Sequence, residues 1–189
     1  MEINQEHIDK ELIEGCRKGD LKFQKLLYKQ FYGFALSVCM RYVDNRDEAS
    51  EILNDGFMKV FTNIGNFDQG KSFKGWIRRI MVNTAIDHYR KNKHHYSTLD
   101  LVYADSETTT EDVMEKISAA EIMAMVQQLS PSYRMVFNLY VMEGYTHPEI
   151  AEKLEITEGA SKSNLHKARV KLQKMINLYY DQKHSSYAR

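Results

Sequence analysis

The chain has 189 residues, of which 43% are hydrophobic, so it is long enough for one medium domain or two small ones and is not disordered overall. Lys and Arg number 26, as do Asp and Glu, and the formal net charge is zero. The two cysteines exclude a disulfide framework, and no apolar run approaches the roughly 20 residues of a membrane span. No secretory signal is visible at the start, so we expect a cytoplasmic protein. Two prolines and nine glycines are few, which predicts an all-α fold.

The first two predicted helices are separated by a break at Gly19. The segment Gln5–Arg17 has the pattern of a short amphipathic helix. The segment Leu21–Tyr42 predicts a longer one, with Asp20 in position to cap its N-terminus. The apolar face of this second helix comprises Phe23, Leu26, Leu27, Phe31, Phe34, Ala35, Val38 and Tyr42.

A third predicted helix, Asp44–Phe61, is acidic in its first part. Its carboxylates there are Asp44, Asp47, Glu48, Glu51 and Asp55. Negative charge near a helix N-terminus complements the helix dipole, which is one interpretation of this cluster. The other interpretation is an exposed acidic face that docks a basic partner, and the residues alone leave both open.

The most basic stretch follows a loop with two glycines, Asn63–Ser72, and predicts a helix over Ser72–His95. From Lys71 to the end of that helix there are seven Lys or Arg and one Asp. The residues that share one polar face are Arg79, Asn83 and Arg90. A cationic helix with embedded aromatic residues suits a phosphate backbone and unstacked bases, whereas a solvated basic face is the alternative.

Composition changes after this helix. The segment Tyr96–Glu121 contains seven acidic residues and one lysine, which predicts an acidic linker at a domain boundary. Helicity is expected to resume near Glu111. The apolar residues that share a side from there onward are Val113, Ile117, Ala120, Met123, Ala124 and Val126.

The C-terminal part has the spacing of a helix-turn-helix motif. Ser130–Pro131 begins a helix that Gly144 ends, and Thr146 caps a short helix that leads into the turn Glu155–Thr157. The next helix is basic, with five Lys or Arg and one Glu over Glu158–Lys174. Its inward residues are Ser161, Leu165, Ala168 and Leu172. A helical hairpin that binds no DNA is the alternative interpretation.

Three segments together resemble the sigma factors of bacterial RNA polymerase, specifically the extracytoplasmic-function group of the sigma-70 family. They are DEASEILNDGFMKVF (47–61), FKGWIRRIMVNTAIDHYRK (73–91) and the helix-turn-helix stretch from 129 to 172. Members of this group have only the second and fourth sigma domains, so the resemblance implies two small helical domains joined by an acidic linker. The implied bounds are 1–95 for a helical bundle, 96–111 for the linker, 112–180 for a helix-turn-helix domain and 181–189 for a disordered tail.

The resemblance also implies a function and its residues. A sigma factor binds core RNA polymerase, reads the minus-thirty-five and minus-ten promoter elements and helps to melt the DNA. The residues implied for the minus-ten element are Asn66, Phe67, Lys71, Arg79, Asn83, Arg90 and Lys91. Those implied for the minus-thirty-five element are Lys162, Ser163, Asn164, His166, Lys167 and Arg169. The residues that match the polymerase-binding segment are Asp47, Glu48, Glu51 and Asp55, which favours docking over the dipole interpretation.

The implied partners are core RNA polymerase (the clamp helices of its largest subunit and its beta flap), promoter DNA and an anti-sigma protein. No cofactor, metal or membrane insertion is implied. Trp76 is assigned mainly to the core. Glu155 stands where many members have glycine, and Ser161 stands where they have a branched apolar residue, so the hairpin is expected to be slightly loosened. Asn164 and Lys167 stand where arginine is frequent, which leaves the promoter sequence open.

A stand-alone helix-turn-helix regulator is the alternative function, and it would bind duplex operators without polymerase. An enzyme is not expected, because the chain lacks a glycine-rich phosphate loop and a nucleophile motif. Its histidines are also scattered, and His94–His95 closes a basic helix instead of joining carboxylates at ligand spacing.

Overall fold

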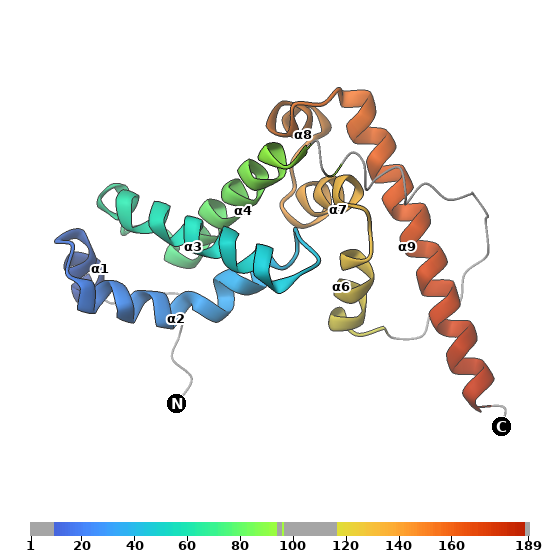
Figure 1. Cartoon of the computed structure of the whole chain (residues 1–189), viewed down its shortest axis with the longest axis horizontal. Helices are drawn as coiled ribbons and strands as arrows, with labels where there is room; N and C mark the ends of the chain where they lie inside the picture. The colour runs from blue at the N-terminus through green and yellow to red at the C-terminus, as the bar shows by residue number, and fades with distance from the viewer. Residues whose placement is uncertain (1–9, 94–95, 97–116, 188–189) are drawn as a thin grey trace. The chain divides into compact units, whose positions relative to one another are not determined.

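The computed structural model describes residues 10–93, 96 and 117–187. Every regular element in these ranges is a helix (Figure 1), which confirms the predicted all-α fold. None of these helices is long and apolar enough to cross a membrane. The chain divides into two compact units, Met1–His88 and Tyr89–Arg189. The predicted linker lies outside the described residues except for Tyr96, so its bounds stay a prediction.

Within the described residues, the first unit contains three α-helices, one 3₁₀ turn and most of a fourth α-helix. In chain order they are α1 (Lys10–Arg17), α2 (Leu21–Cys39), α3 (Arg46–Asn63), the single turn η1 (Ile64–Asn66) and α4 (Phe73–Lys91). Asp20 caps α2 as predicted, since its carboxylate accepts a 2.8 Å hydrogen bond from the Lys22 amide. Asn45 caps α3 in the same way through the Glu48 amide. The predicted start of α1 before Lys10 lies outside the described residues.

The core of the first unit is rich in aromatic rings. Phe73 of α4 packs edge-on against Phe31 of α2, with 5.2 Å between ring centroids, and Phe57 of α3 is also buried. The prediction that Leu26 belongs to the buried face is wrong, because its side chain is 54% exposed. Successive residues of a helix lie about 100° apart, so Leu26 points away from the side on which Leu27 is fully buried.

Both cysteines of the chain are buried in this unit. Burial raises the pKa of the Cys39 thiol to about 12, and burial together with the nearby Asp20 carboxylate raises the pKa of Cys16 to about 11. Both thiols therefore stay protonated at neutral pH and act as small packing groups.

The second unit is built from short helices that pack on one long one. In chain order they are α6 (Ala119–Gln127), α7 (Pro131–Phe137), the π-helical turn η2 (Asn138–Met142), α8 (His147–Leu154) and α9 (Glu158–Tyr187). Gly144 ends η2 as predicted, in the left-handed region with φ of 76°. The predicted continuous helix up to Met142 is correct in extent, but its last turn is π-helical, with the Glu143 amide bonded to the Asn138 carbonyl.

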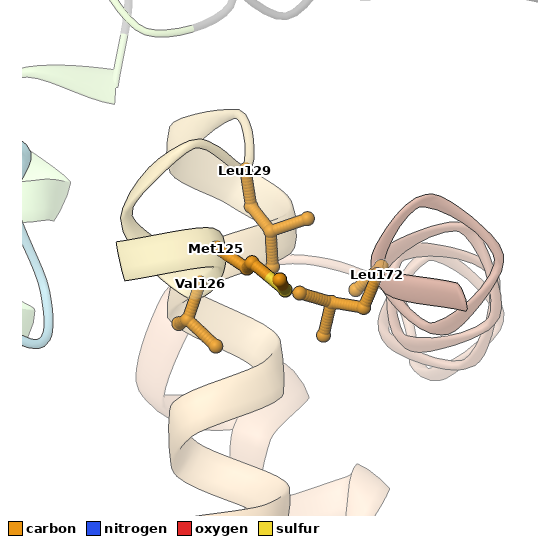
Figure 2. Packing of buried hydrophobic residues seen from close by; sticks show 5 residues of the cluster. Met125, Val126, Leu129 and Leu172 are labelled. Atoms are coloured by element: carbon orange, nitrogen blue, oxygen red, sulfur yellow. The ribbon is translucent and has the colours of Figure 1, made fainter. Parts of the chain in front are cut away.

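One hydrophobic cluster of the second unit lies between α9 and the end of α6. Met125, Val126 and Leu129 pack with Ala168 and Leu172, and Figure 2 shows Met125 pointing toward Leu172. Farther along α9, the hydroxyl of Tyr179 donates a hydrogen bond to Glu121 of α6. The long helix α9 is thus the common support for the shorter helices of this unit.

The sequence makes predictions about the start of α6 and the end of α9. The predicted resumption of helicity near Glu111 lies outside the described residues, and within them α6 begins after Ser118, which is its N-cap and forms a capping box with Glu121. The predicted disordered tail from residue 181 is helical as far as Tyr187. No glycine or proline follows Gly159, so nothing in the sequence stops α9 earlier.

The contact of α1 with α2 at Gly15 predicts opposite effects for two glycine-to-alanine substitutions. A Cβ at Gly15 would overlap the base of the Phe23 ring, whereas a Cβ at Gly33 in α2 would meet nothing within 4 Å. We expect Gly15→Ala to lower the free energy of unfolding by about 1–3 kcal/mol through overpacking. The matched control Gly33→Ala should raise it by up to about 1 kcal/mol through helix propensity. Urea titrations followed by circular dichroism measure both, and equal effects would contradict the packing.

Candidate nucleic-acid interface

The outward side of α9 carries the cations predicted for it. The exposed side chains are Lys162, Ser163, His166, Lys167 and Arg169, and Asn164 is partly exposed. The four predicted inward residues, Ser161, Leu165, Ala168 and Leu172, are all buried. The period of the sequence thus separates a packing face from a polar face on the same helix.

The turn between α8 and α9 is fixed by local hydrogen bonds and by one unusual backbone conformation. Thr146 and Glu149 form a capping box at the start of α8, and the Thr146 hydroxyl and backbone hold the pKa of the Glu149 carboxyl below its ordinary value. Glu155 ends α8 in the left-handed region, with φ of 53° and ψ of 49°. Glycine adopts this conformation without the steric cost that a Cβ brings, which explains why glycine suits the position.

The buried hydroxyl of Ser161 has a partner across the hairpin. Ser161 has no exposed surface, and its Oγ lies 2.9 Å from Nδ1 of His147, the first residue of α8. The expected loosening by a polar residue at this position is therefore offset by a hydrogen bond. At the surface beside it, the Lys162 ammonium lies 2.7 Å from the Glu158 carboxylate and holds the pKa of Glu158 below its ordinary value.

A second group of predicted contact residues lies on α4. Arg79, Arg90 and Lys91 are exposed, and Asn83 is partly exposed. The opposite side of this helix is buried, with Ile77 and Met81 in the core. The helix therefore offers a polar face that begins in its second turn and continues to its C-terminal end.

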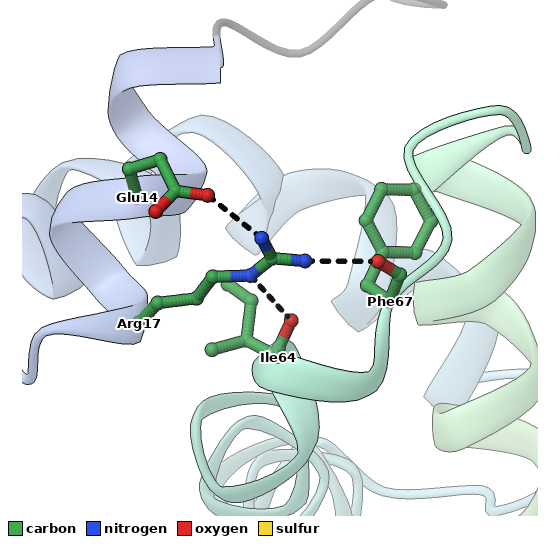
Figure 3. A network of polar contacts seen from close by, with 4 residues as sticks. All are labelled: Glu14, Arg17, Ile64 and Phe67. Atoms are coloured by element: carbon green, nitrogen blue, oxygen red, sulfur yellow. Dashed lines mark hydrogen bonds and ion pairs between the residues drawn. The ribbon is translucent and has the colours of Figure 1, made fainter.

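The loop before α4 is held by an arginine that sequence patterns did not indicate. Arg17 of α1 donates to the carbonyls of Ile64 and Phe67, over 3.4 Å and 3.1 Å, and pairs with Glu14 over 2.7 Å (Figure 3). Two backbone carbonyls of the loop thus receive hydrogen bonds from a charged group, which are stronger than those from neutral donors.

Phe67 and Trp76 form one aromatic cluster under this loop. Phe67 is only 4% exposed, and its ring lies 4.9 Å from that of Phe73 and 5.2 Å from that of Trp76. In this structure Phe67 anchors the loop to the core, and direct contact of its side chain with a base would require it to leave that cluster. Asn66 and Lys71 are exposed beside it. Trp76 is partly buried in the same cluster.

The acidic side chains of α3 lie along its surface. Asp47, Glu51 and Asp55 are exposed, and Glu48 is partly exposed. Asp47 and Glu48 are in the first helical turn, where the helix dipole accounts for them. Glu51 and Asp55 lie beyond that turn, where the dipole effect falls off, and the Glu51 carboxylate lies 3.8 Å from Nε2 of His88.

Two family models match this chain. The model for sigma-70 region 2 matches residues 27–95, and the model for sigma-70 region 4 matches residues 119–172, together more than half of the chain. The chain belongs to the sigma-70 family. The first match contains α3, α4 and the Arg17-bound loop, and the second contains α8 and the first half of α9.

The relatives of this sigma factor span nearly its whole length. It is 25% identical over 180 residues to the RNA polymerase sigma-H factor of Pseudomonas aeruginosa, covering 89% of this chain and 93% of that protein. It is 28% identical over 180 residues to the ECF RNA polymerase sigma factor SigW of Bacillus subtilis, covering 88% and 96%. A similar solved structure is the sigma factor RpoE of Bartonella quintana in complex with the anti-sigma factor NepR, at 20% identity and a TM-score of 0.47, covering 81% of this chain and 96% of that one.

The two family models, together with the names of the sequence relatives, identify the chain as an RNA polymerase sigma factor of the extracytoplasmic-function group, which acts in transcription initiation. Within the described residues, no group of three or more His, Cys, Asp or Glu side chains is arranged to hold a metal ion. The DNA-contact roles of the residues on α4, on the loop before it and on α9, and the docking role of α3, stay predictions.

The hydrogen bonds of Arg17 predict a selective effect on the loop that it holds. Replacement by methionine leaves the Ile64 and Phe67 carbonyls without their charged donor, so we expect Arg17→Met to lower the free energy of unfolding by about 1.5–3 kcal/mol. Amide hydrogen exchange in residues 64–71 should become faster. Arg46→Met, at an exposed position of α3, is the matched control and should change neither quantity. Equal exchange in the two variants would show that Arg17 does not hold the loop.

Proposed function

We propose that this sigma factor directs core RNA polymerase to promoters whose minus-thirty-five element is read by α9. One observation carries the proposal: the cations of α9 are exposed on a helix whose opposite side is locked into the α8–α9 hairpin. A helix held in this way can enter the major groove, with some side chains on phosphates and others on base edges. Lys162, Lys167 and Arg169 supply charge, and Ser163, Asn164 and His166 supply hydrogen-bonding groups.

The minus-ten element is assigned to the loop and α4. A base flipped out of the duplex would meet the loop that Arg17 holds, where Asn66 and Lys71 are exposed. Unstacking costs a few kcal/mol, which contacts of the extruded base must offset. The exposed arginines of α4, together with Asn83 and Lys91, would bind the adjacent backbone and favour strand separation without any covalent chemistry.

Docking on the polymerase is assigned to the acidic side of α3. Its carboxylates would meet the clamp helices of the largest subunit, and the second unit would meet the beta flap. The acidic segment predicted for residues 96–111 would act as a tether between the two DNA-binding modules. Mounting two weak DNA-binding modules on one assembly raises their joint affinity through effective concentration. This function places the protein with the polymerase in the cytoplasm.

An anti-sigma protein is the expected regulator. A protein that covers the loop and α4, α9, or both would deny this sigma factor its promoter. Release of that protein would be the inducing event.

The proposal is tested with promoter fragments obtained by mapping transcript starts after overexpression. With core polymerase, Lys167→Ala should weaken promoter binding, and the slope of log affinity against log salt should fall by about one if Lys167 contacts a phosphate. Lys25→Ala removes the same charge from an exposed position of α2 and should leave both quantities unchanged. Tight duplex binding by the isolated protein, with no core-dependent transcription, would favour a stand-alone regulator.

A further inference from the structure

The π-helical turn η2 presents an aromatic side chain to the helix-turn-helix hairpin. Tyr140 is 36% exposed, and its ring stacks on that of His147, with 4.7 Å between centroids and 27° between planes. The guanidinium carbon of Arg169 also lies over the Tyr140 ring, 5.8 Å from its centroid. Tyr140 thus contacts the first residue of α8 and an exposed residue of α9.

The backbone of η2 explains why this ring is at the surface. The π-helical turn contains one extra residue per hydrogen-bonded loop, which changes the direction of the side chains that follow. Asn138 and Leu139 turn inward and are fully buried, whereas Tyr140, Val141 and Met142 are all more than one-third exposed. The Tyr140 ring is therefore not needed to fill the core.

The His147 side of the stack is rigid. The His147 ring is bound to the fully buried Ser161 hydroxyl, so it is fixed to the interior of the hairpin. A ring that stacks on a fixed imidazole is itself restricted. The contacts therefore run from Ser161 through His147 and Tyr140 to Arg169.

Of the four residues joined by these contacts, Arg169 is exposed to solvent on the outer side of α9. A long arginine side chain loses rotamer freedom when it binds a phosphate, and a guanidinium held over an aromatic ring has lost part of that freedom beforehand. The N–H groups of the guanidinium can still form bidentate hydrogen bonds to phosphate oxygens. A lysine at the same position would keep the charge but not the planar group that forms such bonds.

We propose that Tyr140 is a positioning residue for duplex recognition, which holds the Arg169 guanidinium ready for a phosphate of the minus-thirty-five region. The proposal rests on the proposed function and adds a residue outside the α8–α9 hairpin. Tyr140 acts through Arg169 and does not itself contact DNA. A purely structural role for Tyr140 would instead affect folding and would not depend on which residue is at position 169.

A double-mutant cycle with the full-length protein, core polymerase and a mapped promoter fragment tests this. Tyr140→Phe keeps the ring and should bind as the wild type does. Tyr140→Leu should weaken binding about two- to fivefold, the effect of losing an exposed cation–π contact. In the Arg169→Ala background, Tyr140→Leu should cause no further loss. Val141→Ala, at the next exposed position of η2, is the control and should leave binding unchanged.

Arg169→Lys gives an independent result that does not depend on how well the Tyr140 variants fold. It should weaken binding by about the same two- to fivefold factor while leaving the salt slope unchanged, because the charge is kept. Additive losses from Tyr140→Leu and Arg169→Ala, or wild-type binding by Arg169→Lys, would overturn the positioning role. If the wild-type protein shows no core-dependent promoter binding, the proposed function itself fails, which is a distinct outcome.

Discussion

The burial of one apolar side on each short helix is the constraint on which the rest of the structure depends. Helices such as α8, with eight residues, are too short to be stable alone and must pack to persist. Ile150 and Leu154 of α8 and Leu165 of α9 are buried, which holds the hairpin together and directs the cations of α9 outward. In α4, burial of Ile77 and Met81 directs Arg79 outward in the same way. Packing therefore uses one side of these helices and leaves the polar residues on the other side, where the proposed function assigns DNA contacts.

Hydrogen bonds between elements fix the positions of two segments, in addition to the packing of apolar side chains. Arg17 joins α1 to the loop before α4, and the pair of His147 and Ser161 joins the two helices of the hairpin. Both act on segments that buried apolar residues also hold, such as Phe67 in the loop and Leu154 in the hairpin. Fixing such segments before binding lowers the entropy that is lost when DNA binds. In the proposed function, these polar contacts therefore both stabilise the fold and prepare the DNA-binding segments.

Local signals made much of the fold predictable from the sequence. Asp20 and Thr146 cap helices where they were expected, because a capping side chain bonds to an amide two or three residues away. The outward cations of α9 follow from helical period alone. The capping box at Ser118 was not predicted, because it lies inside a pattern that indicated a continuous helix. The exposure of Leu26 could not be predicted from hydrophobicity, because it depends on which side of α2 the other helices occupy. The contacts of Arg17 with the loop and of Tyr140 with Arg169 join residues that are distant in sequence, so the helical periodicity does not indicate them.

The central claim is that two DNA-facing surfaces of one chain act on a promoter only when polymerase carries both. Hydroxyl-radical footprinting of a mapped promoter fragment tests it most directly, with the full-length protein in the presence and absence of core polymerase. The account predicts no protection by the protein alone, and two separate protected patches, at the minus-thirty-five and minus-ten elements, when core polymerase is added. Protection of the duplex by the protein alone, or a single patch at one element in the complete assembly, would contradict it.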